Sequence, residues 1–410
     1  MGRELAITAL LVLVYRLGVH IPLPGVPVTD LTASLSGSAI ALADMFTGGA
    51  LARASLLSLG VMPYITAQIV VQMIGYAVPS LGEHWNTDEA SRLEQVRLCR
   101  WLGLAIGLAE AVGYTLLLPT MGVDLSKSPL GLVPTCAVVI VGLVVGEALV
   151  MLMGELIDQL GVGQGMSVLI FANVISTVPP ALLRSLDGGP KAAAETVLVA
   201  VFLVAAMAAI VWVELGYRRI PVQLSASGAA GAHAFGSMTY IPIKVNTAGV
   251  VPVMVASAIL FVPQAILILA PNAPGLKAFA ETFSTGPVSW LVELVVIIAL
   301  SYAYALVVVD PDRIADEMAR QGNFIPGVRP GTDTARLIRK VISDVTLPGA
   351  LFMAVLAIVP QVLFYIIGNP LLSVLGGTSL LIIVGVAVNI STSLEGEAAN
   401  GAYADYVTEV

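Results

Sequence analysis

The chain has 410 residues, of which 58% are hydrophobic and only 11% are charged, and its formal net charge is −8. Soluble domains keep about a quarter of their residues charged, so this composition excludes an ordinary soluble domain and is typical of an integral membrane protein. A transmembrane β-barrel is also excluded, because the short alternating segments of such barrels do not recur along the chain.

Long apolar runs predict helices that span the membrane, because every backbone polar group in hydrocarbon must be paired within its own segment. We therefore expect an all-α, polytopic membrane protein of about ten transmembrane helices. The predicted spans are residues 5–19, 56–78, 98–119, 132–156, 166–184, 195–215, 247–270, 286–309, 345–367 and 371–391.

The first apolar run lacks a small-residue cleavage site before Arg16, so we expect a membrane helix and not a signal peptide. If the spans alternate in direction, Lys and Arg concentrate in the connections on the side of the N-terminus, as at Arg97 and Arg339. The positive-inside rule therefore predicts that both termini lie in the cytoplasm. Arg16 itself falls inside the first predicted span.

Two connections are too long to be simple turns, residues 217–246 and 310–344, and both lie on the predicted cytoplasmic side. In the first, two short extended pieces bracket the Gly-, Ala- and Ser-rich tip 225–236, which predicts a hairpin. In the second, Pro and Gly surround Phe324 and Arg329 and predict a rigid turn that presents an arginine to solvent. The alternative interpretation is that this arginine only anchors the topology.

The region before the second span predicts a broken helix. Gly48 and Gly49 offer a turn and Pro63 suits the first turn of a helix, so a half-helix is expected near 44–55. In membranes, such breaks occur only where the chain is buried in protein or lines a water-filled cavity. Ordinary helix packing is the other interpretation of this pattern.

Glycines alternate at Gly161, Gly163 and Gly165, between two apolar helices. A phosphate-binding loop needs a strand before its glycines, so a tight turn is favoured over a nucleotide site. The 3 histidines are scattered, and no spacing of Cys and His suits a metal. We therefore expect no cofactor, no metal site and no enzymatic activity.

A series of short motifs resembles the SecY family in order and spacing over nearly the whole chain. The motifs are IPLPGV at 21–26, FTGGAL at 46–51, LGVMPYITAQIVVQ at 59–72, GELIDQLGVGQGMS at 154–167, RRIPVQ at 218–223, YIPIKVNTAGVVP at 240–252, FIPGVRPG at 324–331 and TLPGALF at 346–352. The resemblance implies two inverted halves of five helices each, residues 1–184 and 185–410, around an hourglass pore.

The resemblance also implies three groups of site residues within the membrane. The waist of the pore would be an apolar ring of Val61, Ile65, Ile170, Met254 and Ile382. The plug that closes the pore would contain Phe46, Thr47, Gly48, Gly49, Ala50 and Leu51. A lateral gate toward lipid, between the second and seventh spans, would include Thr66, Gln68, Glu110 and Asn246.

The function implied by the resemblance is that of the central channel subunit of a Sec-type translocase. Such a subunit passes unfolded secretory polypeptides across the lipid bilayer and releases transmembrane segments sideways into lipid. The implied location is the bacterial plasma membrane, with the thylakoid membrane as the alternative.

The implied partners are SecE-like and SecG-like small membrane subunits and the SecA motor ATPase, and Arg218, Arg219 and Arg329 fall on the basic contact positions. The ribosome is a further partner of the family. The tip 225–236 has no Lys or Arg, which disfavours ribosome docking, because attachment to ribosomal RNA depends on clustered positive charge.

Two other classes of protein stay open at this point. A secondary transporter would also use inverted repeats, with Glu110 and Glu147 as a proton relay within the membrane. That class does not account for the long loop around Arg329. A non-conducting SecY-like paralogue would fold and bind partners without translocating polypeptides.

Overall fold

Helices dominate the fold. The structure is a computed structural model, and it describes residues 2–26, 44, 47–78, 80–81, 84–85, 89–123, 131–186, 189–223, 238–247, 249, 251–253, 255–256, 286–369, 371–372 and 375–408. Long apolar helices and one two-stranded sheet make up the described part of the chain, which agrees with the all-α class expected from the sequence.

The first half of the chain supplies one group of helices. They are α1 (Gly2–Gly18), α4 (Met62–Ala77), α6 (Glu89–Leu117), the short 3-10 helix η1 (Leu118–Met121), α7 (Leu132–Leu160) and α8 (Gly165–Leu186). Helix α4 packs on α6, α6 packs on α7, and α1 lies against both α7 and α8.

The second half supplies the other group. It contains α9 (Gly189–Glu214), β1 (Tyr217–Gln223), β2 (Met238–Lys244), α12 (Pro287–Val308), α13 (Pro311–Arg320), α14 (Thr332–Ile367) and α16 (Gly377–Thr408). Helix α14 packs on α12, α13 and α16, and α16 also lies against α9 and α8. The contact of α16 with α8 therefore joins the two groups.

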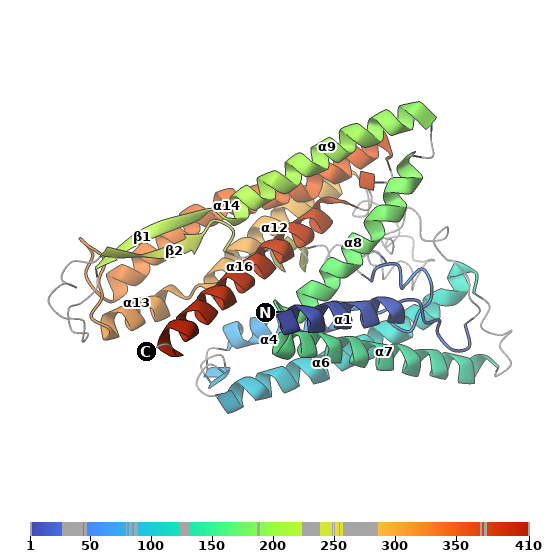
Figure 1. Ribbon diagram of the computed structural model, residues 1–410, viewed down its shortest axis with the longest axis horizontal. Coiled ribbons are helices and arrows are strands. Elements are labelled where there is room, and N and C mark those ends of the chain that lie inside the picture. Colours follow the sequence, from blue (N-terminus) through green and yellow to red (C-terminus); the bar gives the residue numbers. More distant parts are fainter. Residues whose placement is uncertain are drawn as a thin grey trace.

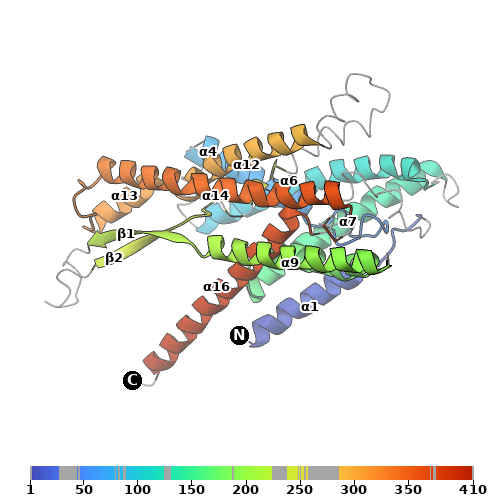
Figure 2. The same cartoon turned by 90° about the horizontal axis from the view of Figure 1, so that it is seen from above.

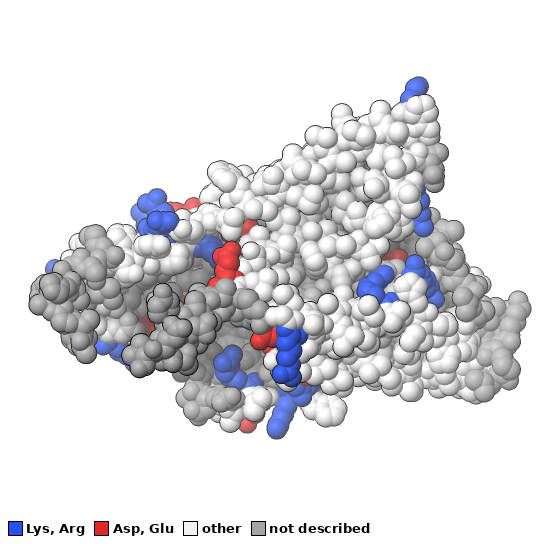
Figure 3. All heavy atoms as spheres, viewed as in Figure 1, with Lys and Arg blue, Asp and Glu red and all other residues white. Residues whose placement is uncertain are grey.

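The two groups form two layers that are linked by α8, which crosses obliquely from the lower layer to the start of α9 (Figure 1). The view from above shows α9, α14 and α12 running nearly parallel, while α16 runs obliquely to them and crosses beneath α9 (Figure 2). The surface over α8 and α9 is largely free of charged side chains (Figure 3), as expected for a face in contact with lipid.

Nine of the ten predicted spans coincide with described helices, namely α1, α4, α6, α7, α8, α9, α12, α14 and α16. The remaining span, 247–270, lies mostly outside the described residues. Six helices of the described part are long and apolar enough to cross a membrane, and α1, α4 and α6 are not among them. Helices α1 and α4 have only 17 and 16 residues, and α6 begins with several charged residues.

The predicted tight turn between the fourth and fifth spans is confirmed. Helix α7 ends at Leu160 and α8 begins at Gly165, whose backbone N–H donates to the Asp158 carboxylate at 2.6 Å. Gly163 has a φ of +81°, and a Cβ on Gly165 would lie 2.0 Å from the Gly154 carbonyl oxygen. The alternating glycines are therefore needed for the turn and for the close approach of the two helices.

The predicted hairpin is confirmed as well. Strands β1 and β2 pair antiparallel from Tyr217 with Lys244 to Gln223 with Met238, and the tip between them lies outside the described residues. The second long connection holds α13, followed by turns. Helix α14 then begins at Thr332, well before the predicted span 345–367, so its first turns belong to this connection.

Candidate functional site

The structure brings four of the five predicted ring residues into one hydrophobic cluster. Val61 precedes the first turn of α4 and is 1% exposed, and Ile65 lies one turn further along. Ile170 from α8 and Ile382 from α16 are 3% and 2% exposed. Met254 lies outside the described residues. Because α16 belongs to the second group of helices, this cluster lies where the two halves of the chain meet.

Local sequence explains the place of Val61 and Ile65. Gly60 has a φ of +60°, and Pro63 stands in the first turn of α4, so the chain turns sharply and then enters the helix. The Ile65 backbone N–H donates to the Val61 carbonyl oxygen at 3.2 Å. The two side chains are four residues apart and therefore lie on one side of the helix.

The segment predicted as the plug forms turns where it is described. Thr47, Gly48, Gly49, Ala50 and Leu51 are buried or nearly so, and Phe46 lies outside the described residues. The half-helix predicted near 44–55 does not continue through residues 47–54, which form consecutive turns. Gly48 and Gly49 have φ values of +69° and +85°, and these left-handed conformations interrupt a right-handed helix.

The four predicted gate residues are not joined to one another by any hydrogen bond recorded in the described part of the chain. The Thr66 hydroxyl donates to the Met62 carbonyl within α4, and Gln68 lies on the same helix. Asn246 is 7% exposed, and its Nδ2 donates to the Glu214 carboxylate at 2.7 Å. Asn246 thus fastens the end of the hairpin to α9 within the second group of helices.

A contact that the sequence did not reveal connects α4 to α12. The Tyr304 hydroxyl donates to Gln72 Oε1 at 3.0 Å, and the two residues come from different halves of the chain. A tyrosine hydroxyl and a glutamine amide in hydrocarbon both need a polar partner. Gln72 and Tyr304 are polar residues within otherwise aliphatic helices, which indicates in each case that a polar partner is needed. Sequence spacing cannot identify that partner, because the two residues are far apart in the chain.

The two acidic residues of the predicted proton relay lie on neighbouring helices. Glu147 of α7 is 2% exposed, and a Cβ on Gly107 of α6 would lie only 1.4 Å from its Oε2. Gly107 therefore makes the space that the Glu147 carboxylate occupies between the two helices. Glu110 lies one turn further along α6.

The two long connections form one structural unit at the end of the molecule. We call it the hairpin module, and it consists of β1, β2, α13, residues 321–331 and the first turns of α14. Its apolar cluster contains Ile220, Val222, Ile243, Met318, Ile325, Ile338 and Ile342. Gln223 and Phe324 exchange two backbone hydrogen bonds, of 2.9 and 3.2 Å, which tie the hairpin to the second connection.

The predicted basic residues of the hairpin module are all exposed. Arg219 lies over the Tyr217 and Tyr240 rings, at 5.0 and 4.7 Å from the ring centroids, and donates to the Tyr217 hydroxyl at 2.6 Å. That hydrogen bond raises the pKa of Arg219 above its usual value. Arg218 points to the other face of the strand, because side chains alternate along β1.

Arg329 lies in a turn that contacts on both sides hold to the rest of the module. Ile325 is 4% exposed within the apolar cluster of the module, and the Thr334 hydroxyl donates to the Arg329 carbonyl oxygen at 3.0 Å. Gly327 and Gly331 have φ values of +84° and +97°, which permit the sharp turns on both sides. The guanidinium itself projects into solvent.

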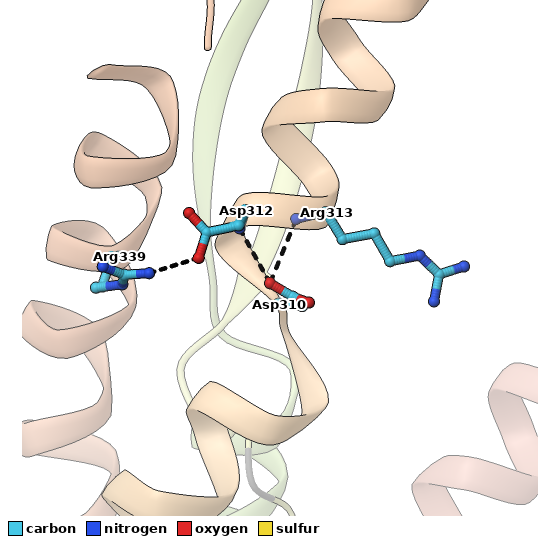
Figure 4. Close-up of polar contacts among 4 residues, drawn as sticks. All are labelled: Asp310, Asp312, Arg313 and Arg339. Carbon is cyan, nitrogen blue, oxygen red and sulfur yellow. Dashed lines mark hydrogen bonds and ion pairs between the residues drawn. The ribbon is translucent and has the colours of Figure 1, made fainter. Parts of the chain in front are cut away.

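Helix α13 is attached to α14 by polar contacts (Figure 4). The Asp310 carboxylate caps α13 by accepting from the backbone N–H groups of Asp312 and Arg313 at 3.0 and 3.3 Å. Asp312 and Arg339 form an ion pair at 2.6 Å between the two helices. The Arg313 side chain points away from these groups, so it adds a further positive charge to the surface of the module.

Comparison with known proteins identifies the family. A family model described as SecY matches residues 55–391. The protein translocase subunit SecY of Mycobacterium bovis is 32% identical, and the match covers 96% of this chain and 94% of that protein. The protein of the same description from Streptomyces scabiei is 33% identical with the same coverage.

Solved structures share the fold at lower identity. A SecY protein, described by the role of its plug domain in the closed translocation channel, has a TM-score of 0.67 and 19% identity. Sec61 in a canine ribosome–channel complex has a TM-score of 0.62 and 19% identity. Each match covers 97% of this chain and 92% of the other chain. The family match and the shared fold together establish that the chain belongs to the SecY family of multi-pass membrane proteins.

Proposed function

We propose that this chain is the pore-forming subunit of a Sec-type translocase, which passes unfolded polypeptides across a membrane and releases apolar segments sideways into lipid. The observation that carries the proposal is the buried cluster of Val61, Ile65, Ile170 and Ile382 at the meeting of the two halves. A narrow ring of apolar side chains excludes water and ions without a charged gate.

The direct test is translocation in proteoliposomes that contain the chain together with its small membrane subunits. We expect a secretory polypeptide to become protected from external protease when SecA and ATP are supplied, and not when the chain is omitted. Protection that is equal with and without the chain would refute the function. The relatives named above are translocase subunits, so the comparisons favour neither a secondary transporter nor a non-conducting paralogue.

The resemblance places the lateral gate between the second and seventh spans, and we propose that the eighth span, α12, also borders it, because the Gln72–Tyr304 hydrogen bond joins α12 to α4. When these helices separate, both polar groups lose their partner, so the bond favours the closed gate. Thr66, Gln68, Glu110 and Asn246 remain further candidates for this gate.

Removing the Tyr304 hydroxyl should make the gate easier to open. For Tyr304→Phe we expect about fivefold more lateral release of a marginally apolar test segment, the effect of losing one neutral hydrogen bond. The matched control is Tyr302→Phe, because the Tyr302 hydroxyl donates at 3.3 Å to Ser343 within the second group of helices. Equal release by the two variants would refute the role of Tyr304.

The hairpin module is the proposed docking surface for the driving partner. Its exposed Arg218, Arg219 and Arg329 stand on a rigid base, which suits a partner with an acidic surface. We propose SecA as that partner and SecE-like and SecG-like subunits as membrane partners, in the bacterial plasma membrane with both termini in the cytoplasm. We further propose that ribosome binding is weak and that the chain catalyses no reaction itself.

Charge reversal at Arg329 should uncouple the channel from its motor. For Arg329→Glu we expect about a tenfold or greater loss of SecA-driven translocation, because like charges then face each other at the docking point. Thermal stability should hardly change, since the guanidinium is exposed. Circular dichroism melting and protease protection measure the two quantities.

The control for this prediction is Arg336→Glu. Arg336 is also exposed and lies nearby on α14, where it pairs with Asp333 at 3.1 Å. If both charge reversals reduce translocation equally, the effect comes from the net charge of the module and not from a contact of Arg329. If neither reduces it, Arg329 only anchors the topology.

A further inference from the structure

Arg16 is a charged residue in the last turn of the first membrane helix, α1. An ionisable side chain at such a position is costly and needs polar partners. Arg16 Nη1 donates to the carbonyl oxygen of Gly48 at 3.3 Å and to Asn173 Oδ1 of α8 at 3.3 Å. One guanidinium therefore connects α1, α8 and the start of the segment 47–51.

The partners of Arg16 are held in place by their own contacts. Asn173 is fully buried, and its Nδ2 donates at 2.7 Å to the hydroxyl of Tyr15, which is also fully buried. This bond turns the amide so that Oδ1 faces Arg16. We call Tyr15, Arg16, Asn173 and the Gly48 carbonyl the Arg16 clasp.

Gly48 is the residue that permits the clasp. Its φ is +69°, and a Cβ there would lie 2.3 Å from Arg16 Nη1 and 2.7 Å from Asn173 Oδ1. Only glycine can bring its carbonyl oxygen to the guanidinium without displacing both partners. The FTGGAL motif therefore serves a specific contact as well as a turn.

The clasp adjoins the proposed ring. Asn173 lies one turn after Ile170 on α8, and Tyr15 belongs to the same hydrophobic cluster as Val61 and Ile382. Basic side chains gather in a hollow beside the end of α1 and the chain that follows it (Figure 3). The segment 47–51 is thus tied down directly beside the constriction that the family resemblance expects it to close.

A second anchor holds the same segment from the other side. The Tyr114 hydroxyl of α6 donates to the Leu51 carbonyl oxygen at 2.8 Å, and the Ser58 hydroxyl donates to the Ala50 carbonyl at 2.9 Å. These bonds are shorter than the two made by Arg16. The Arg16 side is therefore the attachment with the longer hydrogen bonds.

We propose that the Arg16 clasp is the release point that holds segment 47–51 over the closed pore, an inference that rests on the proposed function. A polypeptide that enters the pore breaks the bond from Arg16 to Gly48. Arg16 then keeps its bond to Asn173. Water in the opened pore accepts hydrogen bonds from the guanidinium N–H that Gly48 has released. Release is thus reversible, and Arg16 is a positioning residue of the closed state.

Two neighbouring glycines provide a matched test. Gly48→Ala and Gly49→Ala both place a side chain in left-handed backbone, with φ values of +69° and +85°, so their backbone strain is similar. A Cβ on Gly49 would meet nothing closer than 4.0 Å, whereas a Cβ on Gly48 would displace Arg16. Both variants keep every charge and therefore the topology.

The measurement is the resting ion conductance of planar bilayers, together with maleimide labelling of Ala52→Cys in a Cys99→Ala, Cys136→Ala background. Ala52 is 1% exposed while the segment is seated. For Gly48→Ala we expect both quantities to rise about tenfold over Gly49→Ala, the effect of losing a charge-assisted hydrogen bond. Arg16→Met should give the same increase.

Equal conductance and labelling in Gly48→Ala and Gly49→Ala would overturn the clasp. If Gly48→Ala does not fold, Arg16→Met decides by the same comparison with the parent chain. Protease protection of a secretory polypeptide is measured in parallel. If the parent chain translocates and the two glycine variants behave alike, only the clasp is refuted. If the parent chain does not translocate, the proposed function is refuted. Labelling needs no translocation, so it still decides the clasp.

Discussion

The double variant Ile65→Asn, Ile382→Asn should leak ions at rest. The two side chains come from α4 and α16 and meet in one buried cluster with Val61 and Ile170. Two amides there would bind water and abolish the dewetting that seals an apolar constriction. We expect the resting conductance of planar bilayers to rise by at least about tenfold. Because the two substitutions remove apolar side chains from both halves of the chain, the increase should exceed that of either single variant.

The control for the ring is Val70→Asn on α4, which adds the same amide to the same helix at a side chain that is 37% exposed. An exposed site in lipid should lose insertion or stability and leave the resting conductance unchanged. If the double variant folds and remains as ion-tight as the parent chain, these isoleucines are ordinary core residues and the ring assignment is wrong.

Gly377→Val should prevent α16 from packing on α14. A Cβ on Gly377 would lie 2.1 Å from the Leu356 carbonyl oxygen and 2.2 Å from the Ala357 Cα. These are backbone atoms of α14, so no side-chain rotation relieves the overlap. We expect a loss of unfolding free energy of about 4 kcal/mol or more, measured by denaturation in detergent.

Gly396→Val is the matched control for this effect. Gly396 lies on the same helix, and a Cβ there would meet no atom within 4 Å. Valine is a better helix former than glycine, so this variant should be as stable as the parent chain or slightly more stable. Similar losses of stability in both variants would contradict the close packing of α16 on α14.

The ring could be predicted from local pattern only within α4. Val61 and Ile65 are four residues apart, and helix geometry alone places them on one face. Ile170 and Ile382 belong to helices far away in the sequence, and only the resemblance to a family grouped them with α4. Their common cluster agrees with that grouping. The role of these residues as a seal stays a prediction.

The hairpin of β1 and β2 and the turn around Arg329 could be predicted from sequence, because the residues that indicate them lie close together in the chain. Prolines, β-branched residues and a Gly-rich tip lie within one short stretch, and the pairing of Tyr217 with Lys244 confirms the expected strands. The bridge between Gln223 and Phe324 was not predicted, because it depends on how two separate connections dock on each other.

The polar contacts within the membrane were the least predictable part of the site. Arg16 was recognised only as a charge inside a span, and Tyr304 was not singled out at all. Asn246 was assigned to the gate, whereas its recorded partner is Glu214 on α9. Each contact joins segments that are distant in sequence, so its partner is set by tertiary packing and not by any period along the chain.

The length of α14 has a mechanical consequence. Its 36 residues begin in the hairpin module and end at Ile367, a distance of about 54 Å at 1.5 Å per residue. A partner that tilts the first turns of this helix displaces Leu356 and Ala357 in its second half, which touch α16 and, through it, the ring residue Ile382. Pro348 interrupts the hydrogen bonds of α14 between its first turns and these contacts, so the helix bends there and transmits only part of such a tilt.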